Sequence, residues 1–158
     1  VICIIVNHAF VKTIRLTYKK MPCLRIAPIC NGKIYVAPRS YQGEEPGKLD
    51  IPMEDYIYAC KTDMDKYAQE VKNKYSNHIA EQPEPRFSLK HLVKETNEVE
   101  KTIILYVLPL NDEEQIHFVG GKFVTPEEIE MNPTQYSSCL KEEVNHLNIV
   151  AQMWKEFK

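Results

Sequence analysis

Glycine is scarce in this chain, and neither sign of charge dominates it. Only five of the 158 residues are glycine, and neither G-x-G-x-x-G nor G-x-x-x-x-G-K-[ST] occurs, which excludes the glycine-rich loops that cradle nucleotide phosphates. The 20 basic and 22 acidic side chains give a formal charge of -2, so the strong basic field of a nucleic-acid-binding domain is absent. At 158 residues, the chain has the length of one domain.

Paired cysteines and clustered histidines are also missing. The five cysteines are scattered and odd in number, and C-x-x-C, H-x-H and H-x-x-x-H do not occur. A disulfide framework and a closed zinc site are therefore not expected, and free thiols favour a reducing compartment. G-x-S-x-G is absent as well, which argues against a serine hydrolase. The sequence predicts no metal ligands and no bound cofactor.

Residues 1–20 run from an apolar stretch to a basic one. Nine of the eleven residues of Val1–Val11 are apolar. This stretch is shorter than the roughly 20 apolar residues that are needed to span a bilayer. Basic residues follow, an order typical of a last membrane helix that ends on the cytoplasmic side: Lys12, Arg15, Lys19 and Lys20. The first strand or helix of a soluble domain fits the same residues equally well. The first residue is not Met, which indicates a processed chain or a piece of a longer one. We expect residues 1–20 to be a lead-in, either the end of a membrane helix or a linker, and residues 21–158 to form the domain.

The first half of the domain predicts a hairpin, a short strand and a helix. Leu24–Ile29 and Lys33–Ala37 are β-prone runs on either side of Asn31-Gly32, a dipeptide typical of a tight hairpin turn. Tyr56–Cys60 is a further β-prone run, and Thr62–Tyr75 predicts a helix. The apolar residues of that helix recur at the spacing of one buried face: Met64, Tyr67, Ala68 and Val71.

The second half predicts further strands and then helices. Thr102–Leu110 is the most apolar run and predicts a central strand, with Arg86–Glu95 extended before it and Ile116–Val119 as a short strand after it. Thr125 before Pro126 and two acids is typical of a helix start. A final helix from about residue 135 to 157 carries one apolar face: Leu140, Val144, Leu147, Val150, Ala151 and Trp154. This order predicts an α/β (α+β) fold, a mixed sheet with helices on its faces.

The order of these elements and four of the segments resemble the Nudix hydrolase family. The resemblance covers the chain from about Leu24 to about Leu147. LRIAPICNGKIYVAPRS resembles the opening hairpin of that family, LDIPMEDY stands where the family has Pro-Gly-Gly, TIILYVLPL resembles its central strand, and GGKFVTPEEIE resembles the late segment that opens a short helix. The resemblance implies a Nudix-like α/β/α sandwich with a mixed central sheet.

The sequence departs from the family where the family places its chemistry. Nudix hydrolases carry Gly, five residues, Glu, seven residues and then Arg-Glu-hydrophobic-x-Glu-Glu-x-Gly, whose glutamates bind magnesium beside a diphosphate. The best match here is Gln69–Lys74, in which Glu70 is kept but Asn73 and Lys74 replace the metal-binding pair. The glycines expected after Pro52 are Met53 and Glu54. The resemblance therefore implies a degenerate Nudix box, no magnesium-dependent hydrolysis and no catalytic residue to assign.

Four residues are the candidates for ligand binding. Glu54 and Asp55 flank the expected cleft, Arg39 ends the second strand of the hairpin, where it can meet a phosphate, and Glu70 keeps its place in the box. The alternative for these side chains is structural: solvated loop charges for the acids and a surface salt bridge for Arg39.

Three functions follow from these observations. The first is a non-catalytic regulatory or ligand-sensing domain, expected on the cytoplasmic side of the inner membrane as part of a cation/proton antiporter of the Na⁺/H⁺ or K⁺/H⁺ type. The second is a divergent hydrolase of nucleoside diphosphate derivatives that uses Glu54, Asp55 and Glu70, and the third is a protein–protein interaction module. Expected partners are a nucleotide or small phosphorylated ligand and the membrane portion of the same polypeptide. Nucleic acid is not expected, a homodimer stays open, and without a transporter host the location is cytoplasmic.

Overall fold

The computed structural model describes residues 21–81, 83–94 and 100–156, so the predicted lead-in of residues 1–20 lies outside the described part. Its elements are β1 (Cys23–Cys30), β2 (Lys33–Pro38), β3 (Leu49–Asp50), β4 (Met53–Tyr56), α2 (Met64–Asn73), β5 (Arg86–Lys94), β6 (Glu100–Pro109), β7 (Lys122–Val124), α3 (Pro126–Met131) and α4 (Ser138–Glu156). Two short 3₁₀ turns, Glu113–Gln115 and Pro133–Gln135, flank β7 and α3. Within these residues, no helix has both the length and the apolar character needed to cross a membrane.

The sheet is mixed, as predicted. Its strand order is β3-β2-β1-β6-β5, with β4 paired to β1 and β7 paired to β2. Among the described strands, β1 and β6 are the one pair that runs parallel, and the other pairs are antiparallel. β1 pairs with β4 through Cys23–Ile26 and with β2 only at Ile29 and Cys30. The strands β2 and β4 therefore diverge from one another beside β1.

The predicted hairpin between β1 and β2 is confirmed. Cys30 pairs with Lys33 across a loop of two residues. Asn31 and Gly32 have positive φ angles of 52° and 77°, the combination that a type I′ turn requires and that this dipeptide adopts at low cost. This turn matches the right-handed twist of the two strands.

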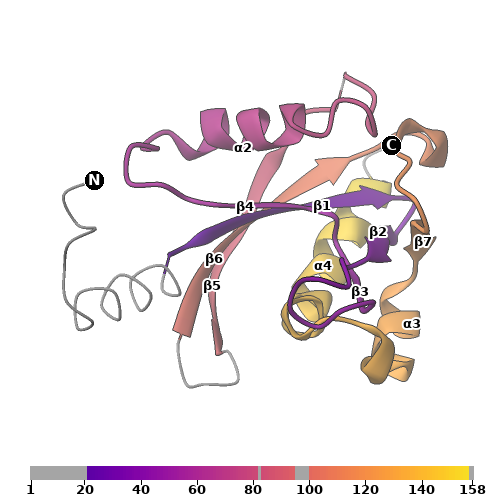
Figure 1. Ribbon diagram of the computed structural model, residues 1–158. Helices are drawn as coiled ribbons and strands as arrows, with labels where there is room; N and C mark the ends of the chain where they lie inside the picture. Colours follow the sequence, from indigo (N-terminus) through magenta and orange to yellow (C-terminus); the bar gives the residue numbers. More distant parts are fainter. Residues whose placement is uncertain (1–20, 82, 95–99, 157–158) are drawn as a thin grey trace.

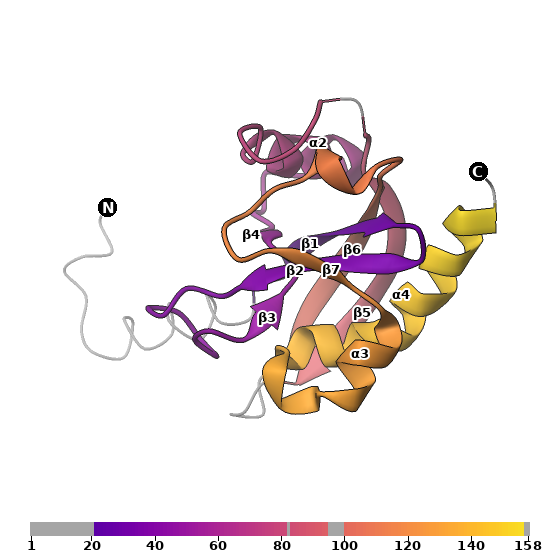
Figure 2. The same cartoon turned by 90° about the vertical axis from the view of Figure 1, so that its right-hand side faces the viewer.

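Helices cover both faces of the sheet. Figure 1 shows α2 above the strands, and Figure 2 shows α3 and α4 on the opposite side. Successive residues of β1 serve opposite layers because side chains alternate along a strand. Leu24 and Ile26 pack in the cluster beneath α2, whereas Ala27 and Ile29 pack in the cluster beneath α4. The predicted α/β/α sandwich is thus confirmed.

Most predicted elements are present with shifted ends. The predicted helix 62–75 is α2, which begins after Asp63 because the Asp63 carboxylate accepts a hydrogen bond from the Lys66 amide at 3.2 Å. Thr125 caps α3 through a reciprocal capping box with Glu128. The predicted central strand is β6, and the extended stretch before it is β5.

Two predicted strands are wrong. The strand beside α2 is Met53–Tyr56 rather than Tyr56–Cys60, because Tyr56 already faces Cys23, the first residue of β1, and no strand among the described residues pairs with 57–60. Ile116 makes only an isolated bridge with Ile79, so 116–119 is not a strand. Trp154, predicted on the buried face of the last helix, is 37% exposed.

The apolar face of α4 is expected to carry much of the stability. Leu147 is fully buried, and its replacement by Ala should cost about 2–5 kcal/mol in unfolding free energy because a cavity remains beneath the helix. Ile149, two residues along the same helix, is 62% exposed, and Ile149→Ala should change that free energy by only about 0.5 kcal/mol. Urea unfolding followed by circular dichroism measures both. Equal effects would contradict the assignment of the buried face.

Candidate functional site

An arginine lies in the core beneath α4. Arg25 occupies the position of β1 between Leu24 and Ile26, so strand alternation points it into the α4 layer, where it is fully buried. Its guanidinium binds Glu143 of α4 through two nitrogens, with Nε 3.0 Å from Oε2 and Nη2 2.9 Å from Oε1. Nη2 also donates to Asp50 at 2.7 Å, and Nη1 donates to Glu54 at 2.8 Å. One guanidinium thus joins β3, β4 and α4 to β1.

Two further groups extend this cluster. Nη1 of Arg39, just after β2, donates to Oδ2 of Asp50 at 3.0 Å. Nε2 of His91, on β5, lies 3.0 Å from Oε2 of Glu143. We call these six residues the buried charge network: Arg25, Arg39, Asp50, Glu54, His91 and Glu143. The network extends from His91 on β5, an outer strand of the sheet, to Arg39 just after β2.

The charges of the network support one another. Burial by itself would lower the pKa of Arg25, but the carboxylates of Asp50, Glu143 and Glu54 outweigh it and hold that pKa well above its ordinary value. Burial would likewise raise the pKa of Asp50, but Arg25 and then Arg39 keep it below the ordinary value. Both groups are therefore charged at neutral pH. Within the described ranges, no buried side-chain nitrogen or oxygen lacks a hydrogen-bond partner.

A cleft opens where β2 and β4 diverge. Its volume is about 490 Å³, and we call it the site cleft. Arg39, Asp50 and Glu54 line its charged side, and Tyr75, His78 and Phe118 line its aromatic side. The rings of His78 and Phe118 are stacked, with centroids 4.2 Å apart and planes 11° apart. Charged groups of both signs beside an aromatic stack suit a ligand that carries a planar ring, an anionic group and hydrogen-bond donors.

The structure brings two of the four predicted ligand-binding residues together. Arg39 and Glu54 both line the site cleft. Asp55 neighbours Glu54 on β4, and its carboxylate forms an ion pair with Lys74 at the end of α2. Glu70 accepts a hydrogen bond from Lys61 at 2.8 Å and lines a separate hollow of about 180 Å³ at the beginning of α2. Asp55 and Glu70 are therefore not part of the cleft lining.

The sequence patterns do not single out the residues that hold the site together. They place Arg25 on the hairpin, Asp50 in a short extended piece and Glu143 on the last helix, and they assign none of the three to the site. A signal for Glu143 exists, because it stands three residues after Leu140 and four before Leu147, on the helix face predicted to be buried. A charged residue on such a face requires a buried partner, and Arg25 inside an apolar strand is its natural counterpart.

The segment that follows α2 is fixed by a buried lysine. Lys72 is 4% exposed, and its ammonium donates to the carbonyls of Glu81, at 2.7 Å, and Pro83. Burial lowers the pKa of Lys72.

Nowhere in the part of the chain that the structure describes do three or more His, Cys, Asp or Glu side chains gather closely enough to hold a metal ion.

The fold is that of the Nudix hydrolases. Ap4A hydrolase from C. elegans superimposes with a TM-score of 0.57 at 12% identity, over 84% of this chain and 98% of that one. The Nudix hydrolase RenU from M. smegmatis gives 0.53 at 14% identity, over 85% and 88%. The C-terminal domain of mouse MUTYH, solved in complex with human PCNA, gives 0.56 at 11% identity, over 83% and 88%. No protein-family model matches the sequence, and no curated protein matches it. Identities this low show the fold alone.

Breaking the buried charge network should destabilise the domain strongly. Glu143→Gln removes one of the charges that compensate the buried guanidinium of Arg25, and we expect a loss of about 3–5 kcal/mol in unfolding free energy. Glu142→Gln, on the exposed side of the same helix turn, is the matched control and should change stability by about 0.5 kcal/mol at most. Chemical unfolding at pH 7 compares them, and a Glu143→Gln protein as stable as its control would refute the role of this pair.

The network should also make stability depend on pH. The pKa of Asp50 is depressed in the folded state, so its stabilising contribution is complete above the unfolded pKa of about 3.9 and is lost as the pH falls through the folded value. The stability gap between the natural protein and Asp50→Asn should therefore be widest above about pH 4 and should narrow in more acidic solution. Urea midpoints measured from neutral to acid pH test this, and a gap that stays constant would show that Asp50 does not act through its charge.

Proposed function

We propose that this chain is a ligand-sensing Nudix-fold domain that binds a nucleotide or similar phosphorylated molecule in the site cleft without hydrolysing it. The observation that carries this proposal is that each of the three acids a hydrolase of this chain would need is paired with a base. Asp55 is paired with Lys74, Glu70 with Lys61, and Glu54 with Arg25. These carboxylates serve as structural anions.

The magnesium ion that the fold family implies does not fit these residues. Magnesium prefers several oxygen ligands from carboxylates and water, and an ammonium beside it is repulsive. Where Nudix hydrolases place their glutamate pair, this chain has Asn73 and Lys74, and the Lys74 ammonium is engaged by Asp55. We therefore infer a degenerate Nudix box with no metal centre on α2.

The site cleft retains the features that recognise a nucleotide. Arg39 follows the end of β2, and its side chain is 24% exposed, so its guanidinium can bind a phosphate while Asp50 holds it in place. The side chain of Glu54 is 34% exposed and can accept a hydrogen bond from a sugar hydroxyl or a base N–H. The stacked pair of His78 and Phe118 offers an aromatic surface to the base.

We further propose that the domain acts as the cytoplasmic part of a membrane cation transporter, of the Na⁺/H⁺ or K⁺/H⁺ antiporter type. This rests on the apolar-to-basic order of residues 1–20, which lie outside the described part. A ligand that binds one arrangement of the domain more tightly than another would shift the conformational equilibrium of the domain, and the membrane portion of the same polypeptide would respond to that shift.

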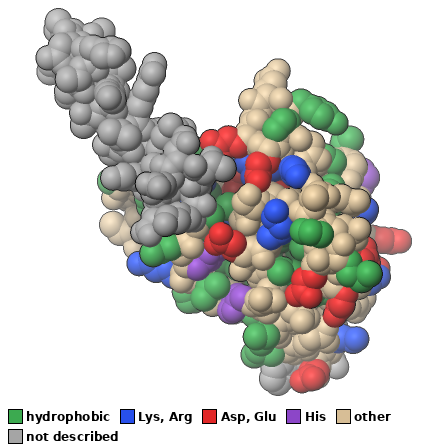
Figure 3. All heavy atoms as spheres, turned by 90° about the horizontal axis from the view of Figure 1, so that it is seen from below, with side chains coloured by type: hydrophobic (Ala, Val, Ile, Leu, Met, Phe, Trp, Pro, Cys, Tyr) green, Lys and Arg blue, Asp and Glu red, His purple; other side chains and the backbone are tan. Residues whose placement is uncertain are grey.

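Nucleic acid is not an expected partner, and Figure 3 shows basic and acidic side chains interspersed on the face in view.

A divergent Nudix hydrolase is the second candidate. The comparisons support it at least as well as the transporter role, because several of the solved structures with this fold are Nudix hydrolases, and another is an Ap4A hydrolase. A hydrolase of this chain would use Glu54, Asp55 and Glu70 on a nucleoside diphosphate derivative. An interaction module is the third, and the MUTYH domain with this fold was solved on a protein partner.

Binding and turnover separate these functions. Calorimetric titration with ADP, ADP-ribose and diadenosine tetraphosphate should give saturable heats without metal. Arg39→Gln should weaken binding about tenfold through the loss of a charge-assisted hydrogen bond, whereas exposed Lys122→Gln should leave it unchanged.

Chromatography of the same ligands after incubation with magnesium measures turnover, and we expect none. Turnover that Glu70→Gln abolishes would establish the hydrolase and overturn the sensing proposal. The absence of any binding heat or thermal shift would favour the interaction module instead.

A further inference from the structure

We propose a second small-molecule site at the ends of the parallel strands β1 and β6, which takes a small aromatic carboxylate. A pocket of about 230 Å³ opens there beneath the last turns of α4, and it shares no lining residue with the site cleft. We call it the C-terminal pocket. It goes beyond the nucleotide-binding function proposed above and does not depend on it.

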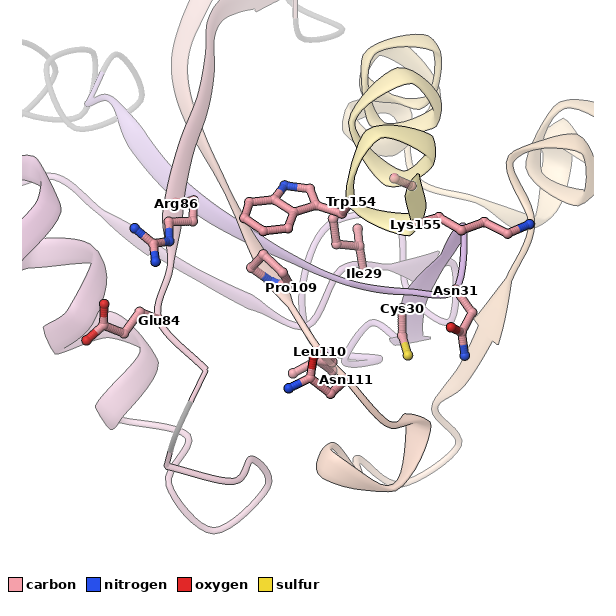
Figure 4. Close-up of a pocket in the computed structure, with 11 residues that line it drawn as sticks. Ile29, Cys30, Asn31, Glu84, Arg86, Pro109, Leu110, Asn111, Trp154 and Lys155 are labelled. Carbon is pink, nitrogen blue, oxygen red and sulfur yellow. The ribbon is translucent and has the colours of Figure 1, made fainter. Parts of the chain in front are cut away.

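The pocket exists because α4 extends past the strands that it covers. Ala151 is still buried against the sheet, but β1 ends at Cys30 and β6 at Pro109, so the next turn of the helix has no strand beneath it. Trp154 lies on this turn, on the same face of the helix as Ala151, and is 37% exposed. Figure 4 shows its indole above Pro109, and Ile29 and Leu110 also line the pocket.

The aromatic wall is available for stacking. Among the described residues, no other aromatic ring packs against the indole of Trp154. Apolar side chains from β1, β6 and α4 form the remaining floor. An exposed tryptophan beside an apolar hollow provides a large contact area for a planar ring, because stacked aromatic groups contribute binding free energy in addition to that from the burial of their surface.

The rim of the pocket favours a negative charge. Arg86 and Lys155 stand on opposite sides of Trp154 in Figure 4, and Glu84 is the only acidic residue in the lining. In the described part of the chain, neither Arg86 nor Lys155 has an ion-pair partner. A guanidinium binds a carboxylate through two parallel hydrogen bonds, so Arg86 is the anchor for the acid group.

The size of the pocket restricts the ligand further. Pockets for drug-sized ligands have volumes of roughly 300–1,000 Å³, and this one is smaller. A nucleotide does not fit, whereas one or two rings with a single carboxylate do. The ligand class of this pocket therefore differs from that of the site cleft.

The sequence supplies a specific reporter for this site. Trp154 is the only tryptophan of the chain, so intrinsic tryptophan fluorescence reads this pocket alone. We expect benzoate and cinnamate to change the Trp154 emission saturably, and the neutral benzyl and cinnamyl alcohols to act at least tenfold more weakly. Saturation-transfer NMR with the same compounds records binding independently of quenching.

Two variants complete the test. Arg86→Gln should weaken benzoate binding at least tenfold, and Lys90→Gln, an exposed cation on the same strand, should not. Trp154→Leu should abolish the NMR signal while the circular dichroism spectrum stays unchanged. The proposal is overturned if neither method detects saturable binding of the acids, if the alcohols bind equally well, or if Arg86→Gln binds like the natural protein.

Discussion

The buried guanidinium of Arg25 is the constraint on which the rest of the structure depends. A charge with no exposed surface is tolerated only where opposite charges and hydrogen bonds replace water. Asp50, Glu54 and Glu143 supply them from three different elements, and the bonds have lengths between 2.7 and 3.2 Å. The positions of β3, β4 and α4 around β1 are therefore set by one side chain as well as by apolar packing.

This constraint also shapes the cleft. β1 can pair with β4 along its first half and with β2 only at its end, and Arg25 bridges the region between them through Asp50 and Glu54. Arg39 then reaches Asp50 from the end of β2. Carboxylates held in this way are committed to arginines, and the same charges give the cleft its polar side. Our proposal of a binding role rests on that pairing.

Local patterns predicted much of the fold but little of the site. The hairpin around Asn31-Gly32, the central strand β6 and the long last helix follow from turn chemistry and periodicity, which act within a few residues. The failures at 56–60 and 116–119 arose because a strand needs a partner, and β-prone residues alone do not supply one. Arg25 and Glu143 are 118 positions apart, so only the folded sheet and helix bring them together.

The last helix connects the buried charge network with the C-terminal pocket. Glu143 near its beginning holds the buried charge network, and Trp154 near its end covers the C-terminal pocket. They lie eleven positions apart along the helix, which corresponds to about 16 Å. The contacts that hold Glu143 on Arg25 therefore also fix the direction in which the last turns of α4 leave the sheet. The place of Trp154 over the C-terminal pocket thus depends on the same buried guanidinium that orders the strands beside the site cleft.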